Sequence, residues 1–383
     1  LFGSEYKSFF HYPEFKKSFS IRTMKEYLSF QNILSSNTFL EGINLLEPGS
    51  YAIYSLQNKS LKITKYWDFN FSSEHKINHN DAKAELKFLF KRAVESQLMS
   101  DVEIGSYLSG GIDSGSITSI ASQKIDNLKS FTCGFDLTSA SGIELVFDER
   151  KNAELMSSIF MTEHYEIFIK SGDMERCIHD LVFHLEDPRV GQSYPNFYAS
   201  KLASKFVKVV LSGAGGDELF AGYPWRYFNQ KLLKNNSDFF ESYYSYWQRM
   251  LSFNEFKKLL QPISEADDAR YLRDVFFKNI KNSDENQSYE SLINSSLYFE
   301  AKTFLHGLLI VEDKLSMAHG LETRVPFLDN DLVDFAMKCP LSLKLKKEDL
   351  NLKVNENSID KYKKNNTQGK LILRKSLSDL VPK

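Results

Sequence analysis

Two glycine-rich segments combine small residues, hydroxyl groups and one acidic residue directly after an apolar run. The first is LSGGIDS, residues 108–114, and the second is LSGAGGDE, residues 211–218. Glycine lets the backbone approach a ligand closely, serine hydroxyls and backbone N–H groups donate hydrogen bonds, and the start of a helix favours an anion. A polyanion such as a polyphosphate is therefore the expected ligand.

An aspartate stands near the end of each segment, Asp113 in the first and Asp217 in the second. A carboxylate repels a bare phosphate, so a bridging Mg²⁺ makes better sense of both residues. The first segment is neither a dinucleotide fingerprint nor a Walker motif, because the lysine of the latter is absent. By itself, each segment also fits a plain glycine-rich turn that caps a helix. Two copies of one layout favour a shared ligand site.

Strand-like and helical segments alternate from residue 100 to about residue 220. Strands are predicted at 103–108, 130–135, 164–168 and 207–211, and helices at 81–99, 114–125, 148–160, 173–186 and 195–206. This alternation predicts an α/β fold in which a parallel sheet is covered by helices on both faces. Ligands of open α/β sheets bind beyond the carboxyl ends of the strands, so both glycine segments are expected at one cleft.

The flanking regions have other patterns. Residues 1–75 mix short apolar alternations with turn signals, which predicts a β-rich unit that ends at a polar linker near 72–80. Residues 221–345 are predicted to be helical, and the charged segment 344–366 is predicted to be a solvated loop. Because the chain starts at Leu1 without the features of a signal peptide, we expect a fragment of a longer protein.

Composition restricts the class of protein. The chain has 48 Lys and Arg against 50 Asp and Glu, and its net charge of −2 gives no general attraction to nucleic acid or acidic membranes. No apolar run of the sequence approaches the roughly 20 residues that a membrane helix needs. Cys133, Cys177 and Cys339 lie far apart and match no disulfide framework or zinc spacing. We therefore expect a cytoplasmic protein without nucleic-acid or membrane partners.

Other candidate chemistry has weaker support. His179 and His184 are five residues apart on one predicted helix, a spacing that does not suit joint metal ligation. Ser212 is not part of a G-x-S-x-G nucleophile elbow. Residues 184–196 fit a wall of an acceptor pocket as well as a helix-capping loop. Residues 312–329, EDKLSMAHGLETRVPFLD, are interpreted mainly as a packing segment with a buried ion-pair network near the site.

Three motifs taken together resemble the synthetase half of the glutamine-dependent asparagine synthetase family. They are LSGGIDS, which is similar to the pyrophosphate-binding loop of adenine-nucleotide alpha hydrolases (PP-loop), LSGAGGDELFAGY and EDKLSMAHGLETRVPFLD. FGSEYKSFF and PGSYAIYSLQNKSLKITKYWDF resemble the end of the family's N-terminal-nucleophile glutaminase domain. The resemblance implies that residues 1–75 are the end of the glutaminase domain, that residues 76–383 are the synthetase domain, and that the extreme C-terminus is missing.

The same resemblance implies an activity and roles for particular residues. The implied enzyme is an ATP-dependent ligase that adenylates the aspartate side chain and aminates it with glutamine-derived ammonia, giving asparagine, AMP and pyrophosphate. Asp113 and Asp217 would hold Mg²⁺, and Lys370 in GKLILRK would neutralise charge as the acyl-adenylate forms and reacts. The residues implied to bind the nucleotide are Leu108, Ser109, Gly110, Gly111, Asp113, Ser114, Cys133, Ser212 and Gly213.

Two departures from the family pattern leave alternatives open. Ala214 stands where the best-studied members carry an acidic residue tied to activating the aspartate carboxylate. A related amidotransferase or lactam-forming ligase that uses another carboxylic acid, in surface polysaccharide or natural-product assembly, therefore remains an alternative. The glutaminase cysteine would lie upstream of Leu1. A homodimer is left open as an assembly.

Two further alternatives come from other functional classes. An RNA-modifying relative would need a basic face and often a cysteine pair, and the net charge of −2 with isolated cysteines disfavours it. A non-catalytic binding protein is disfavoured because Asp113, Asp217 and Lys370 are all present.

Overall fold

The central sheet has five strands, and all of its neighbouring pairs are parallel. The computed structural model of the chain describes residues 1–72, 77–136, 138, 148–189, 193–227, 236–251, 253–263, 265, 267–281, 288–346 and 369–382. The strands are β3 (Ile104–Tyr107), β4 (Lys129–Phe135), β5 (Glu163–Ile169), β6 (Val209–Leu211) and β7 (Glu322–Arg324), and their order is β5-β4-β3-β6-β7. The predicted parallel sheet and the adjacency of its four predicted strands are confirmed.

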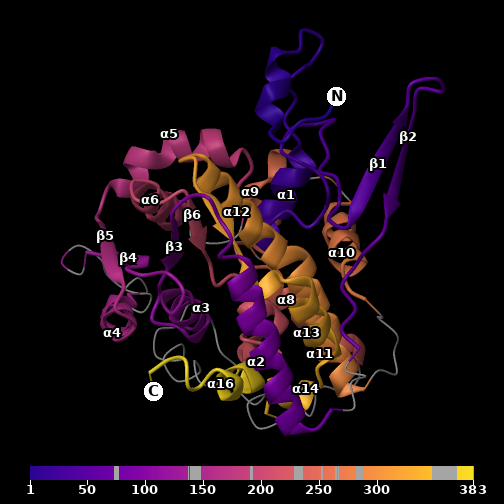
Figure 1. Cartoon of the computed structure of the whole chain (residues 1–383). Coiled ribbons are helices and arrows are strands. Elements are labelled where there is room, and N and C mark those ends of the chain that lie inside the picture. The colour runs from indigo at the N-terminus through magenta and orange to yellow at the C-terminus, as the bar shows by residue number, and fades with distance from the viewer. Residues whose placement is uncertain are drawn as a thin grey trace.

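Helices cover both faces of this sheet, as Figure 1 shows. The helices with predicted counterparts are α2 (His79–Ser96), α3 (Ile112–Ser122), α4 (Arg150–Phe160), α5 (Asp173–Leu185) and α6 (Ser193–Ala203). Helix α3 contacts β3, α2 and α4, and α6 contacts β4, β5 and α5. Small residues of α3 permit close packing, since Thr118 Oγ1 lies 2.8 Å from Ser106 Oγ of β3.

A large helical layer follows β6, as predicted for residues 221–345. Its described elements are α7 (Gly216–Leu219), η3 (Pro224–Arg226), α8 (Asn236–Trp247), α9 (Phe253–Leu259), η5 (Gln261–Ile263), α10 (Asp268–Lys278), α11 (Tyr289–Phe299), η6 (Glu300–Leu305), α12 (His306–Met317), η7 (Pro326–Leu328), α13 (Asn330–Lys338), α14 (Leu341–Lys344) and α16 (Leu371–Ser376). The π-helical turn η6 joins α11 and α12 into one continuous rod. Aromatic rings from α8, α10 and α11 fill the core of this layer, with Phe276 and Phe299 centroids 4.7 Å apart.

The N-terminal region corrects the expectation of a β-rich unit. It contains η1 (Tyr6–His11), α1 (Ile21–Phe30) and a single antiparallel hairpin of β1 (Ser50–Ser55) and β2 (Ser60–Lys65). Helix α1 buries a polar face, in which Lys25 Nζ pairs with Asp268 of α10 at 2.6 Å. An apolar pattern therefore could not reveal this helix. The hairpin extends away from the helical body in Figure 1.

Some expectations fall partly outside the described residues. Residues 73–76 of the expected linker and residues 347–368 of the expected solvated loop are not described. Lys344, at the start of that loop, is buried, and its Nζ donates to the carbonyl of Ala336 at 2.6 Å. Within the described ranges, none of the helices combines the length and the apolar character that crossing a membrane requires.

Candidate active site

The two glycine-rich segments lie side by side at the carboxyl ends of the neighbouring strands β3 and β6. In the first segment the backbone N–H of Ser109 donates to Ser114 Oγ at 2.9 Å, and the two hydroxyls are 2.8 Å apart. This contact folds the segment over the first turn of α3, whose N-cap is Gly111. The first four backbone N–H groups of a helix have no partner inside the helix, so this turn suits an anion.

Lys370 brings a positive charge to this point from the far end of the sequence. Its Nζ pairs with a carboxylate oxygen of Asp113 and lies 2.6 Å from Oδ1 of Asp217. The lysine side chain is only 8% exposed. It sits at the N-cap of α16, and its backbone N–H donates to the carbonyl of Phe220 at 3.2 Å. Three residues that the sequence singled out therefore form one charge cluster, in which Lys370 is buried and the Asp217 side chain stays 32% exposed.

The pKa values in this cluster follow from burial and from the three charges. Burial raises the pKa of Asp113, and the charge of Asp217 raises it further, whereas Lys370 acts in the opposite direction. Burial alone would lower the pKa of Lys370, but the two carboxylates outweigh this effect and hold it above its ordinary value. Lys370 is therefore an ammonium group at neutral pH.

The acidic residues of the cluster suit a further cation. Oδ1 of Asp113 is buried and has no hydrogen-bond partner in the described part of the chain. Carboxylate oxygens are the ligands that Mg²⁺ prefers, and one ammonium does not balance two carboxylates. The donor set of Asp113 and Asp217 therefore fits a magnesium ion.

Glycines give the charged side chains the space that they occupy. A Cβ added at Gly222 would lie 1.8 Å from Oδ1 of Asp217, and one added at Gly216 would lie 2.8 Å from Cγ of Asp113. Gly215 has a φ of +98°, a backbone conformation that L side chains rarely adopt. The packing of the charged side chains therefore requires these glycines, whether or not a ligand also approaches them.

The other residues implied to bind a nucleotide lie around the same two strand ends. Leu108 is buried, and its carbonyl accepts a hydrogen bond from Thr132 Oγ1 of β4. Cys133 follows on β4, and burial raises the pKa of its thiol to about 12, although Arg150 opposes the shift. Gly213 packs closely on the first loop, since its added Cβ would lie 3.2 Å from the Cβ of Asp113.

Three glutamates at the site were not selected from the sequence. Glu149 precedes α4, and burial raises the pKa of its carboxyl, whereas Ser109 and the charge of Lys370 oppose the shift. Glu218 is buried and accepts from the hydroxyl of Tyr223 at 2.9 Å, and burial, followed by the charge of Asp217, raises its pKa to about 7. Glu312 is on α12, and burial raises the pKa of its carboxyl to about 7. Only the tertiary structure brings Glu149 near the first loop, so no local spacing could have revealed it. Glu312 opens the segment 312–329, which is interpreted from the sequence mainly as a packing segment.

The segment 312–329 differs from its expected role as a buried ion-pair network. Arg324 Nε pairs with Glu322 Oε1 at 2.7 Å, but the glutamate side chain is 58% exposed. Asp329 caps α13 by accepting from the backbone N–H of Asp331 at 3.1 Å. The apolar residues Leu321 and Phe327 are buried as expected. The segment also forms β7, which the sequence did not predict.

The sequence left open whether residues 184–196 line an acceptor pocket. Part of this loop makes contacts that hold other elements in place. Asp187 is buried, and its Oδ1 accepts from the Tyr6 hydroxyl and the backbone N–H of Phe39, both at 2.9 Å. Arg189 donates to the carbonyl of Ile33 at 3.0 Å. These residues attach the N-terminal region to the connection between α5 and α6, whereas residues 190–192 are not described.

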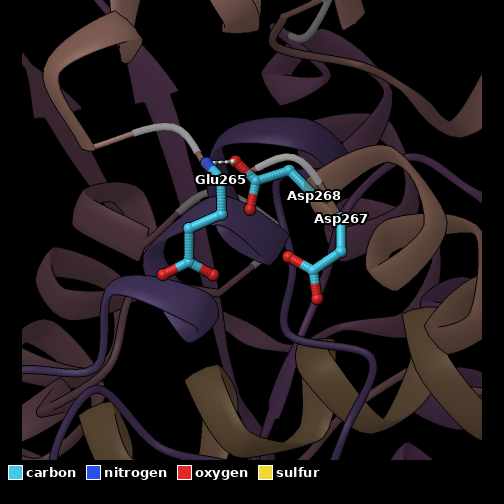
Figure 2. A group of neighbouring side chains, drawn as sticks. All are labelled: Glu265, Asp267 and Asp268. Carbon is cyan, nitrogen blue, oxygen red and sulfur yellow. Dashed lines mark hydrogen bonds between the residues drawn. The ribbon is translucent and has the colours of Figure 1, made fainter.

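A separate acidic group near α10 is also structural. Figure 2 shows Glu265, Asp267 and Asp268, with the backbone N–H of Glu265 donating to Asp268. Asp268 pairs with the buried Lys25, and Arg22 lies 3.5 Å from Asp267. Exposed acidic groups are common without a metal, and the cations of α1 already oppose these charges. The group therefore joins α1 to α10.

Fold and site together define a parallel α/β protein with two glycine loops and a lysine–aspartate cluster at the carboxyl ends of its central strands. The asparagine synthase family model matches residues 85–383, and the chain belongs to this family.

Individual relatives agree with this assignment. The chain is 28% identical to asparagine synthetase [glutamine-hydrolyzing] 1 of Bacillus subtilis over 94% of its own length and 56% of that protein. It is 25% identical to asparagine synthetase [glutamine-hydrolyzing] 3 of the same organism over 100% of its own length and 59% of that protein. Amidase chyE of Penicillium rubens is 24% identical over 90% of the chain and 59% of that protein. The chain thus spans less than two thirds of these relatives.

Proposed function

We propose that the chain is the synthetase part of an ATP-dependent amide-forming ligase. Its acceptor is the side-chain carboxylate of aspartate, its nitrogen source is ammonia released from glutamine, and its products are asparagine, AMP and pyrophosphate. The observation that carries this proposal is the cluster in which the buried Lys370 pairs with Asp113 and Asp217 beside two glycine loops. Family membership supports the same reaction.

In the first step the acceptor carboxylate attacks the α-phosphorus of ATP, and pyrophosphate leaves. The backbone N–H groups of residues 109–114 and the start of α3 bind the β- and γ-phosphates. Asp113 and Asp217 would hold Mg²⁺, which would neutralise charge on the pyrophosphate. The Lys370 ammonium is already fixed by two carboxylates and needs little reorganisation to stabilise the developing negative charge.

The remaining proposed contacts concern the nucleotide and the cellular setting. Leu108, Cys133, Ser212 and Gly213 contact the adenosine, with Cys133 acting as a small buried side chain rather than a nucleophile. Three free cysteines suit a reducing, cytoplasmic setting. A homodimer stays a prediction.

A second candidate is a ligase of the same mechanism that uses another carboxylic acid. Ala214 favours it, because the second loop lacks the acidic residue that the best-studied family members carry there. The same adenylation chemistry would then serve a different acceptor pocket.

An acid-dependent exchange of pyrophosphate into ATP tests both candidates. The chain is incubated with ATP, Mg²⁺, labelled pyrophosphate and one acid at a time from a panel of amino acids and sugar acids. We expect exchange with aspartate and none without an acid or with a chelator of Mg²⁺. Exchange with a different acid alone would select the second candidate, and no exchange with any acid would contradict the proposed reaction.

A further inference from the structure

One tyrosine hydroxyl closes the turn that carries Asp217 and contacts Lys370. Tyr223 donates its hydroxyl to Oε1 of Glu218 at 2.9 Å, and Glu218 directly follows Asp217 in α7. Between the two partners lies Phe220, whose carbonyl accepts from the backbone N–H of Lys370 at 3.2 Å. The hydrogen bond therefore spans the segment that holds one aspartate and the lysine of the charge cluster.

The turn itself is tight. The backbone N–H of Gly222 donates to the carbonyl of Asp217 at 2.8 Å. Ala221, which precedes Gly222, has a φ of +56°, a conformation that residues with a side chain rarely adopt. A Cβ added at Gly369 would collide with the carbonyl oxygen of Ala221, so the residue before Lys370 packs directly on the turn. A shift of the turn would therefore move both partners of the ion pair.

Tyr223 is held in turn by a buried arginine of η3. The guanidinium carbon of Arg226 lies 3.7 Å from the centroid of the Tyr223 ring and 4.4 Å from that of Phe304. Nη1 of Arg226 lies 3.8 Å from Oε2 of Glu300, the first residue of the π-helical turn η6. Glu300 also accepts from the hydroxyl of Tyr243 of α8 at 3.0 Å. These contacts connect Tyr223 to the packed core of the helical layer.

The hydroxyl of Tyr223 contributes more than packing. A phenylalanine could make the same ring contacts with Arg226 and Phe304. The hydroxyl adds a hydrogen bond to the buried carboxylate of Glu218. Burial, followed by the charges of Glu218 and Asp217, raises the pKa of Tyr223 well above its ordinary value. The hydroxyl is therefore a donor at neutral pH, and it fixes the orientation of Glu218 next to Asp217.

We propose that Tyr223 is a positioning residue for the adenylation step, an inference that rests on the proposed function. Through its hydrogen bond to Glu218, Tyr223 fixes the turn that sets where Asp217 and Lys370 lie beside the polyphosphate. It acts through these two residues rather than on the substrates. A misplacement of catalytic groups by about 1 Å can lower a rate by about 10²-fold, so a loosened turn is costly.

Tyr223→Phe tests the hydroxyl alone, because the ring stays in place. In this variant we expect acid-dependent pyrophosphate exchange to fall by about 10- to 10²-fold at a temperature where the protein is folded. Glu218→Gln should retain most of this activity, since its amide oxygen still accepts from the tyrosine hydroxyl. An equal loss in both variants would show that the charge of Glu218 matters rather than the hydrogen bond, and would overturn the proposal.

Tyr271→Phe is the matched control. Tyr271 of α10 is also partly buried, and it donates its hydroxyl to a buried glutamate, Glu26 of α1. Its loss should lower the thermal unfolding midpoint by an amount similar to that in Tyr223→Phe, while pyrophosphate exchange stays at the wild-type rate. If the two phenylalanine variants lose the same activity, Tyr223 acts only through stability.

Amide hydrogen exchange gives a readout that does not depend on turnover. The backbone N–H groups of Gly222 and Lys370 should exchange with solvent about 2- to 10-fold faster in Tyr223→Phe and at the wild-type rate in Tyr271→Phe. Unchanged protection of both groups in Tyr223→Phe, or its full pyrophosphate exchange, would overturn the proposal. If the wild-type chain shows no pyrophosphate exchange with any acid, the proposed function itself fails, whereas amide hydrogen exchange still decides whether Tyr223 holds the turn.

Discussion

Lys370 and Asp113 are costly charges to bury, whereas Asp217 remains partly in contact with solvent. A buried charge loses its hydration, and attraction to an opposite charge repays this loss only with good geometry and further hydrogen bonds. Here one oxygen of Asp113 has no hydrogen-bond partner among the described residues, and two carboxylates compete for one ammonium. A packed apolar cluster would be at least as stable. The cluster is therefore better explained by the chemistry that it can perform than by stability.

We expect Asp113→Asn and Asp217→Asn each to lower acid-dependent pyrophosphate exchange by about 10²-fold or more, because each removes a charge that acts on the polyphosphate. The fold should persist, since the remaining carboxylate still pairs with Lys370. Exchange rates are measured beside thermal unfolding midpoints.

His179→Ala is the control for these variants. His179 is exposed on α5, away from both glycine loops, and its removal should leave exchange at the wild-type rate. Full activity of either asparagine variant at ordinary Mg²⁺ concentration would contradict the role of the aspartates.

The residues of the cluster could be found from sequence because two of them end glycine motifs and the third lies in a family motif. Gly222 also lies in a quoted motif, LSGAGGDELFAGY, but its role beside the cluster could not be read from the sequence. The need for glycine at 222 arises from Asp217 and Lys370, which only the folded chain brings within 2.6 Å of its Cβ position.

The short helix α16 positions the lysine of the site. It packs against α2 and α14, and its residues Ile372 and Leu373 are buried. Lys375 Nζ lies 3.1 Å from His79 Nε2 at the start of α2. Because Lys370 is the N-cap of α16, the docking of this helix sets where the ammonium lies.

Leu373→Ala tests whether α16 supports activity by positioning Lys370 or only by stabilising the fold. Removing the buried side chain should lower the free energy of unfolding by about 2–5 kcal/mol, because it leaves a cavity. Exchange activity at a temperature where the variant is folded should also fall, since Lys370 is held less firmly.

Leu272→Ala provides a matched core substitution on α10, where the leucine is equally buried but distant from α16. It should cost similar stability and leave activity of the folded protein near the wild-type value. Equal activity of the two variants would show that α16 does not act by positioning Lys370.

Elements with a regular apolar pattern were predictable, and short or polar ones were not. The four strands from β3 to β6 appear within a few residues of their predicted places. Strand β7 has only three residues, Glu-Thr-Arg, whose alternation is too short to detect. Helix α1 buries Lys25 and Glu26 through partners distant in sequence, so its buried face resembles a solvent-exposed one.

At the scale of the whole molecule, the hairpin of β1 and β2 differs from the compact remainder. Ile53, Leu61 and Ile63 are 57%, 61% and 57% exposed, and the two strands pair only with each other. The chain as a whole spans 56% of one named relative and 59% of another. Activities that depend on the remaining length of such relatives need to be tested separately from those of the sheet and its cluster.

The nitrogen source distinguishes these activities. Hydrolysis of glutamine by a cysteine nucleophile requires a thiolate. The chain has three cysteines, and burial raises the pKa of the thiol in each of them, to about 12 in Cys133 and also above the ordinary value in Cys177 and Cys339. All three thiols are therefore protonated at neutral pH.

We expect this chain to form the amide with ammonium and to show no synthesis with glutamine alone. The assay follows amide product and glutamate release with each nitrogen source at equal concentration of ATP and acceptor acid. Supplying a separate glutaminase together with glutamine should restore synthesis, because free ammonia then reaches the same site. If the chain alone releases glutamate and makes amide from glutamine, a nucleophile other than these thiols must act in it. The expectation that this chain forms the amide but does not release ammonia from glutamine would then be wrong.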